Sequence, residues 1–188
     1  MSSPATDSSI PRRWRLPDGT EATLRAIAPG DFAIETAFVD GLSADTSFNR
    51  LFSTRHPDAR EIARWTNVDP SREEALVVTS ERDGAEFMLG VARYVRDDDG
   101  PDAEFAIVIG DDWKRVGVGL ALLCALIARA RAAGVREVYG ATLSTNAAMI
   151  ALGRRLGFAA RRVIGDGTVT RLAMTLQGGA GPLSDVRT

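Results

Sequence analysis

The sequence of 188 residues contains very little cysteine, histidine or lysine. Cys124 is the only cysteine, which excludes an internal disulfide framework and a cysteine-based metal cluster. His56 is the only histidine, so multi-histidine metal sites are excluded and a Ser-His-Asp triad would depend on that one residue. We therefore predict that the protein holds no metal ion.

The basic residues are almost all arginine, because Lys114 is the only lysine among the 23 lysine and arginine residues. A GC-rich genome is one explanation, since it raises the arginine content of every protein it encodes. The alternative is that a surface poor in lysine matters to what this protein does.

Long apolar segments and a strong net charge are also lacking. The longest apolar stretch, residues 116–128, is too short to span a bilayer, and the N-terminus lacks the apolar core of a secretory signal. The net charge of -2 produces no overall field that attracts nucleic acid. We predict a cytoplasmic protein that binds neither nucleic acid nor a membrane.

The length fits one folded domain. Residues 1–10 are rich in serine, proline and threonine, and residues 178–188 are rich in glycine. Both ends are therefore predicted to be flexible tails on a single domain over residues 11–177.

Hydrophobic periodicity divides this domain into strands and helices. Runs typical of strands lie at residues 14–16, 20–27, 75–79, 87–95, 103–109, 135–143, 158–164 and 168–176. Helical spacing predicts helices that begin near residues 29, 43 and 57, and longer ones at residues 117–133 and 146–156. This order predicts an α/β fold with a mixed, mostly antiparallel sheet of about six to seven strands and helices on both faces.

The most informative segment follows the strand at residues 103–109. Gly117 and Gly119 stand directly before an apolar helix, and Lys114 and Arg115 precede them. Glycine lets backbone N–H groups approach an anion closely, and a helix N-terminus adds unpaired N–H donors. The segment predicts a pyrophosphate-binding loop, with an ordinary strand-to-helix turn as the alternative interpretation.

Two common nucleotide motifs do not fit this loop. A Rossmann fingerprint requires a third small residue where Leu122 stands, and the acidic residue expected at the end of the next strand is missing. A P-loop requires Gly-Lys-Ser or Gly-Lys-Thr, which does not occur in the sequence.

The loop instead resembles the acyl-CoA-binding loop of the GNAT acetyltransferase superfamily, with the pattern Gln/Arg-x-x-Gly-x-Gly/Ala. Here it reads Lys114-Arg115-Val116-Gly117-Val118-Gly119, with lysine in place of the usual first residue. The stretch from Asn146 to Leu156-Gly157-Phe158 resembles the second GNAT signature. Shorter matches at residues 18–20, 24–27, 41–43, 50–52 and 74–77 resemble bacterial protein lysine acetyltransferases that modify acyl-CoA synthetases. The resemblance covers about residues 16–176.

The resemblance implies a GNAT fold, in which the fourth and fifth strands splay apart, and acetyl-CoA as co-substrate. It also implies which residues bind that co-substrate: Ile107, Val108, Ile109, Lys114, Arg115, Val116, Gly117, Val118, Gly119, Leu120 and Asn146. A backbone N–H of Val108 or Ile109 is expected to bind the oxyanion. Asn146 is expected to cap the helix that follows it as well.

Acyl transfer to an amine needs a base, because a lysine-type amine has a solution pKa of about 10.4 and must be neutral when it attacks. Glu104 is the candidate. Strand alternation places it on one face with Ala106 and Val108, and related acetyltransferases carry a glutamate in a similar Ala-Glu-Phe-Ala context. The alternative interpretation is an exposed glutamate that solvates the end of a strand.

No general acid is assigned. Many family members carry a tyrosine where this sequence has Gly153. Tyr139, Ser144 or a water molecule are the candidates to replace it, or the thiolate leaves ionised.

Two acidic stretches, Asp97-Asp98-Asp99 and Asp111-Asp112, flank the strand that carries Glu104. Solvated turns are the ordinary interpretation of such runs. A second interpretation is that they attract a cationic amine to the acceptor side.

The resemblance therefore implies an acetyl-CoA-dependent N-acetyltransferase that modifies a protein lysine, for example on an acyl-CoA synthetase, and we expect Glu104 to be its general base. A small amine or amino acid as acceptor is one alternative. A non-catalytic acyl-CoA-binding sensor module is the other.

Overall fold

The computed structural model describes residues 10–51 and 56–176. The two predicted tails, residues 1–10 and 178–188, lie outside these ranges except for Ile10.

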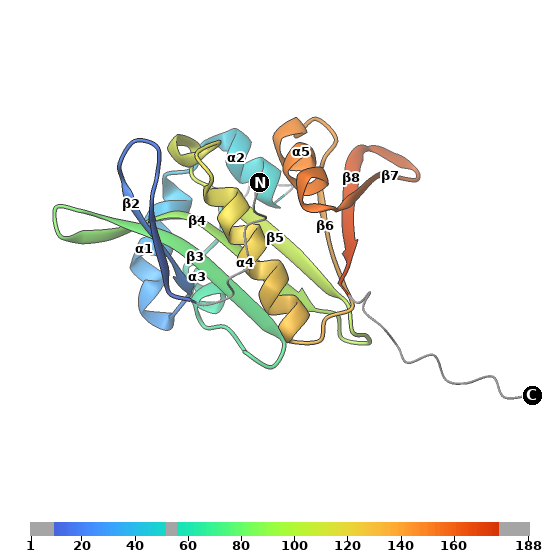
Figure 1. Cartoon of the computed structure of the whole chain (residues 1–188), viewed down its shortest axis with the longest axis horizontal. Coiled ribbons are helices and arrows are strands. Elements are labelled where there is room, and N and C mark those ends of the chain that lie inside the picture. Colours follow the sequence, from blue (N-terminus) through green and yellow to red (C-terminus); the bar gives the residue numbers. More distant parts are fainter. Residues whose placement is uncertain (1–9, 52–55, 177–188) are drawn as a thin grey trace, which may run out of the picture.

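The described chain folds around one mixed sheet with the strand order β1-β2-β3-β4-β5-β6-β8-β7 (Figure 1). The strands are β1 (Arg12–Arg15), β2 (Glu21–Ala26), β3 (Glu73–Arg82), β4 (Ala85–Arg96), β5 (Ala103–Ile109), β6 (Glu137–Leu143), β7 (Ala159–Val163) and β8 (Asp166–Thr175). Every strand pair is antiparallel except β5 with β6. The sheet has eight strands rather than six to seven, because the two short N-terminal runs pair as a hairpin and extend its edge.

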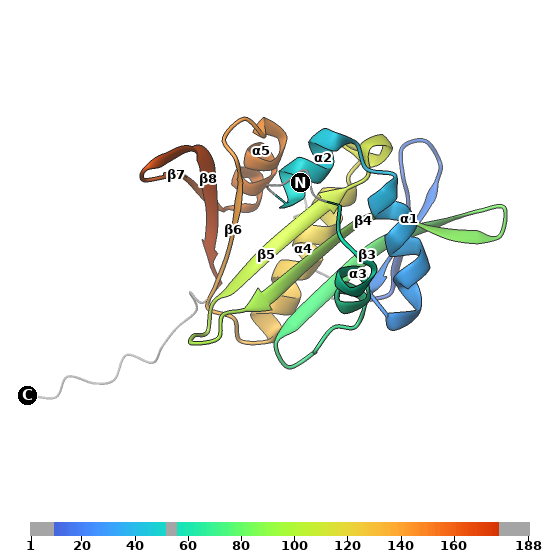
Figure 2. The same ribbon diagram turned by 180° about the vertical axis from the view of Figure 1, so that it is seen from behind.

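Helices cover both faces of the sheet, as predicted. α1 (Phe32–Asp40) and α3 (Ala59–Thr66) lie on one face, and α4 (Val118–Ala132) crosses the other (Figures 1 and 2). α2 (Ala44–Leu51) contacts β5 and β6, and α5 (Ala147–Leu156) contacts α4 and β7. None of the helices in the described ranges has the length and apolarity needed to cross a bilayer.

Strand alternation separates the core into two layers. Leu76, Ala92 and Phe105 pack on the side of α4, in one cluster with Leu122 and Leu126. Val77, Val91 and Val108 point to the opposite face of their strands and pack with Phe38 and Val39 of α1. The prediction that Val108 and Phe105 occupy opposite faces of β5 is confirmed.

β5 and β6 are paired over only two positions, Ala103 with Val138 and Glu104 with Tyr139. The chain reaches β6 from β5 through the crossover helix α4, as parallel neighbours require. Beyond Glu104 the two strands have no further paired positions in the described chain. This is the splayed pair that was predicted as the fourth and fifth strands, and it is the fifth and sixth here because β1 adds a strand at the edge.

Candidate active site

The predicted pyrophosphate-binding loop, residues 114–119, forms a sharp turn directly before α4. It is called the phosphate loop below. Gly117 has a φ of +100°, and Arg115 has a φ of +65°, so both lie in the left-handed region. The first backbone hydrogen bond of α4 is the one that the Ala121 N–H donates to the Gly117 carbonyl over 3.0 Å. The preceding N–H groups, from Val116 to Leu120, have no backbone acceptor among the described residues. Those groups and the helix dipole form a site suited to a phosphate anion.

The space over this turn is open. A Cβ placed on Gly117 would meet no heavy atom within 4 Å. Arg115 is exposed and Lys114 is partly exposed, and both lie on the same loop. The residues present therefore fit the pyrophosphate group that the resemblance implies.

The free edge of β5 faces the gap between β5 and β6. The Gly110 N–H donates to the Leu89 carbonyl in β4 over 2.9 Å, so the alternation of an antiparallel pair directs the Val108 N–H to β4 as well. The N–H and C=O groups of Ile107 and Ile109 consequently point toward β6, where the pairing has ended. Of the two predicted oxyanion donors, this geometry leaves Ile109 with an available N–H.

Glu104 is exposed at the start of β5, on the same face as the exposed Ala106. It lies opposite Tyr139 in the last paired position before the strands separate. It forms no ion pair with any residue in the described ranges. A carboxylate so placed is accessible to a proton donor that enters the gap.

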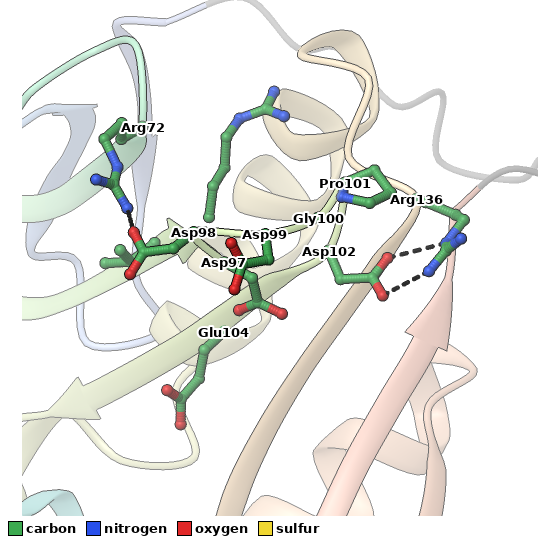
Figure 3. A pocket seen from close by; sticks show the side chains of 11 residues that line it. Arg72, Asp97, Asp98, Asp99, Gly100, Pro101, Asp102, Glu104 and Arg136 are labelled. Carbon is green, nitrogen blue, oxygen red and sulfur yellow. Dashed lines mark hydrogen bonds and ion pairs between the residues drawn. The ribbon is translucent and has the colours of Figure 1, made fainter.

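An open hollow of about 810 Å³ lies beside Glu104 at the β4–β5 hairpin (Figure 3). The three loop aspartates, Asp97, Asp98 and Asp99, line it together with Arg72, Arg96, Asp102, Glu104 and Arg136. Asp98 forms an ion pair with Arg72, and Asp102 forms a two-point pair with Arg136. Asp99, like Glu104, has no ion-pair partner in the part of the chain that the structure describes. The hollow thus keeps a negative balance of charge next to the candidate base.

The structure brings only one of the two acidic stretches to Glu104. Asp111 and Asp112 lie beyond the opposite end of β5, in the turn before the phosphate loop. The hypothesis that the acidic stretches attract a cationic amine is therefore kept for residues 97–99 and dropped for Asp111 and Asp112.

Tyr139 is a poor candidate for the general acid. Its hydroxyl donates to Asp97 Oδ1 over 2.8 Å, and this hydrogen bond, together with burial, raises the pKa of Tyr139 to about 12. Ser144 Oγ is paired with Thr170 Oγ1 over 2.9 Å. A Cβ on Gly153 would lie 3.2 Å from Leu172 Cδ1, so a larger side chain there would have to displace the core. We assign no side chain as general acid.

Lys114 takes part in a polar cluster that sequence reasoning did not find. Its Nζ donates to Asp111 Oδ1 and to Thr46 Oγ1, each over 2.6 Å. Asp111 also accepts from the Ser43 N–H over 2.9 Å. The cluster ties the start of α2 to the phosphate loop, so the lysine supports that loop through Asp111. The spacing of Asp111 and Lys114 was the only sequence signal, since Ser43 and Thr46 are far away along the chain.

These contacts stabilise the charged form of Asp111. Burial alone raises the pKa of this carboxyl, but the hydrogen bond from Lys114 and those from Ser43 and Thr46 outweigh burial and hold its pKa well below the usual range. The Asp111 carboxylate is therefore ionised at neutral pH.

The remaining loop residues contribute backbone and packing. Val118 is buried in the core, Val116 packs against it, and Leu120 is half-buried. Asn146 caps α5, as predicted, because its side chain accepts from the Met149 N–H over 3.1 Å. Its predicted contact with the co-substrate stays a prediction.

Comparison with known proteins places this geometry in a family. Residues 22–159 match the acetyltransferase (GNAT) domain. An acetyltransferase of Pseudomonas aeruginosa is 29% identical over 162 residues, which cover 85% of this chain and 87% of that protein. Acetyltransferase Pat of Mycolicibacterium smegmatis is 31% identical over 135 residues, 71% of this chain and 40% of Pat. An L-methionine sulfoximine/L-methionine sulfone acetyltransferase of Pseudomonas paraeruginosa is 44% identical over 98 residues, 50% of this chain and 56% of that protein.

Solved structures agree on the fold. The GNAT domain of S. lividans PAT superimposes with a TM-score of 0.77 at 24% identity, covering 93% of this chain and 99% of that one. YncA of Salmonella typhimurium, solved with its cofactor acetyl-CoA, has a TM-score of 0.69 at 25% identity and covers 88% and 99%. The splayed strands, the phosphate loop and the match over most of the sequence lead to one conclusion: the chain belongs to the GNAT family of acetyltransferases.

Proposed function

We propose that this protein is an acetyl-CoA-dependent N-acetyltransferase whose acceptor is a lysine side chain on another protein. The observation that carries the proposal is the position of Glu104, which is exposed where β5 and β6 separate and lies beside an acidic hollow. The phosphate loop lies beyond the other end of the same strand. One strand therefore links a candidate base to a candidate anion site.

Acetyl-CoA supplies the acetyl group as an activated thioester. The N–H groups between Val116 and Leu120 and the Arg115 guanidinium would hold its pyrophosphate. The free edge of β5 at Ile107 and Ile109 would pair with an extended ligand chain, much as an added strand does. The Ile109 N–H would then donate to the thioester carbonyl oxygen, and Glu104 would accept the proton of the attacking amine. The new C–N bond would form as the thioester C–S bond breaks, and CoA would leave as its thiolate.

The acceptor side favours a cation presented from outside. The hollow beside Glu104 is open and carries more acidic than basic side chains, including Asp99 with no ion-pair partner among the described residues. Such a surface attracts a protonated lysine side chain before it loses its proton. The resemblance of the sequence to bacterial protein lysine acetyltransferases supports a protein acceptor. The similarity to acetyltransferase Pat covers only 40% of Pat.

A small amine or amino acid is the second candidate acceptor. The similarity to the L-methionine sulfoximine/L-methionine sulfone acetyltransferase supports it, at 44% identity over half of this chain. An enzyme of that kind would keep the same phosphate loop and base and differ in the acceptor side.

The test is a thiol-release assay with acetyl-CoA, run against an acyl-CoA synthetase, lysine peptides and a panel of small amines. Transfer to a protein or peptide lysine at a higher kcat/KM than to any small amine supports the proposal. The reverse order would assign the second candidate. Acetyl-CoA binding with no thiol release by any acceptor would make the protein a non-catalytic acyl-CoA-binding module.

Glu104→Gln is tested in the same assay. Loss of a general base should lower kcat by about 100-fold or more while acetyl-CoA binding stays unchanged. Glu21→Gln is the matched control, because Glu21 is exposed on β2, far along the sheet from β5. Full activity of Glu104→Gln would show that another group takes the proton.

A further inference from the structure

Two arginines lie side by side on the sheet face that carries Glu104. Arg161 in β7 and Arg171 in β8 are direct partners in the antiparallel register, and Ala141 in β6 continues the same row. All three are exposed. The alternate residues of these strands, such as Leu172 and Ala160, pack into the core on the side of α4. The arginines therefore lie on the opposite sheet face from the helix that follows the phosphate loop.

This basic pair, Arg161 and Arg171, is connected to the candidate base through Tyr139. The Arg171 guanidinium stacks on the Tyr139 ring, with its Cζ 4.4 Å from the ring centroid. Tyr139 is in turn the register partner of Glu104. Arg161 lies three strand spacings of about 4.8 Å from β5 and two residues along the strands from the row of Glu104, so the two residues are about 16 Å apart. An extended peptide covers that distance in about four to five residues.

Like charges directly opposite each other in a strand pair are destabilising. Arg171 is partly neutralised by Glu137 over 3.0 Å. Arg161 forms no ion pair with any residue in the described ranges. In Figure 2, α1 and α3 lie over β3 and β4, while β7 and β8 stand at the other side of the molecule. The fold thus keeps an uncompensated cation on an exposed part of the surface.

We propose that the basic pair, Arg161 and Arg171, docks an acidic segment of the acceptor protein about four to five residues from the target lysine. The inference rests on the proposed function, because it assumes a protein acceptor. The surface is complementary to one segment with two charges: the lysine faces the acidic hollow and Glu104, and the flanking carboxylates face the arginines. Charge pairs at such a rim select partners and steer their approach.

The test compares two synthetic peptides with a single lysine. One carries glutamates about four and five residues to either side of the lysine, and the other carries glutamines at those positions. Thiol release at saturating acetyl-CoA gives kcat/KM for each. The wild type should prefer the glutamate peptide by about 3- to 10-fold, and Arg161→Glu should abolish or reverse that preference.

Arg13→Glu is the matched control, because Arg13 is an exposed arginine in β1, at the opposite edge of the sheet. It should keep the preference of the wild type. Arg161→Glu should also keep the wild-type rate with a small neutral-tailed amine, since Arg161 is remote from the phosphate loop and the candidate base.

Equal rates on both peptides in the wild type, or an unchanged preference in Arg161→Glu, would overturn the docking proposal and leave the protein-acceptor proposal intact. Transfer to small amines with none to either peptide would refute both. Sedimentation velocity adds a further outcome. If the wild type is a dimer and Arg161→Glu is a monomer, a second copy of the chain covers this surface and the proposal is wrong.

Discussion

Glu104 and Tyr139 occupy the last paired position between β5 and β6, and the two strands separate beyond them. The candidate base therefore lies at the vertex of the gap into which Ile107 and Ile109 direct their free backbone groups. The hydroxyl of Tyr139 is held by Asp97, so one side of this vertex is built from the acidic hairpin. The pair thus lies between the acidic hollow and the free edge of β5.

The first prediction concerns Gly140, which follows Tyr139. A Cβ there would lie 2.7 Å from the Phe105 carbonyl oxygen, closer than real contacts allow. Gly140→Ala should force β5 and β6 apart at the vertex and destabilise the fold by about 1–3 kcal/mol. Chemical denaturation measures the stability, and kcat with a lysine peptide should fall as well. Unchanged stability and kcat would show that the close approach of these strands is not required.

The second prediction concerns the acidic hollow. Asp99→Asn removes a carboxylate that has no ion-pair partner in the described chain, so the fold should be unaffected. The KM for a cationic lysine peptide should rise by about 2- to 3-fold at low salt, and the difference should shrink as salt screens the charge. Asp83→Asn, in the β3–β4 turn, is the control. An unchanged KM for the peptide at low salt would remove the attraction hypothesis.

The third prediction concerns the turn of the phosphate loop. Gly117 has a φ of +100° and open space around it, so Gly117→Ala adds backbone strain without a steric clash. We expect a loss of about 1–2 kcal/mol in stability and weaker acetyl-CoA binding. Isothermal titration calorimetry measures the affinity.

Gly84→Ala is the matched control for that change, since Gly84 has a φ of +76° and equally open surroundings in a hairpin turn. It should cost similar stability and leave acetyl-CoA affinity unchanged. Equal loss of affinity in both variants would mean that general destabilisation, and not the loop, explains the result.

The fourth prediction concerns Asp111, whose pKa is lowered in the folded protein. A lowered folded pKa adds stability above the unfolded pKa of about 4, and this stability is lost as the pH falls through the folded pKa. Asp111→Asn should lower stability at neutral pH by about 1 kcal/mol, because the carboxylate is partly exposed. The difference in stability between Asp111→Asn and the wild type should become smaller below about pH 4.

Thermal melts across this pH range test the fourth prediction. Asp112→Asn is the control, because Asp112 is an exposed neighbour in the same turn. A difference between wild type and Asp111→Asn that stays constant from neutral to strongly acidic pH would contradict the assignment of the charged cluster with Lys114 and Thr46.

The local features of the site were predictable from the sequence. The turn at Gly117 and the cap at Asn146 are short-range signals, because each depends on the backbone of a few consecutive residues. The faces of β5 followed from alternation, which separates Glu104 and Val108 from Phe105. The contact of Lys114 with Thr46 could not be predicted from local sequence, because the two residues are 68 positions apart.

By itself, then, the sequence determined the order of strands and helices and the glycine turn before α4, and it named the candidate phosphate loop and the candidate base. Only the tertiary structure decided that β5 and β6 separate after Glu104, that Tyr139 faces it, and that Lys114 contacts Asp111 and Thr46. The physical reason is range: turns, caps and alternation are set by neighbouring residues. Register, strand divergence and polar clusters depend on which distant segments the sheet places side by side.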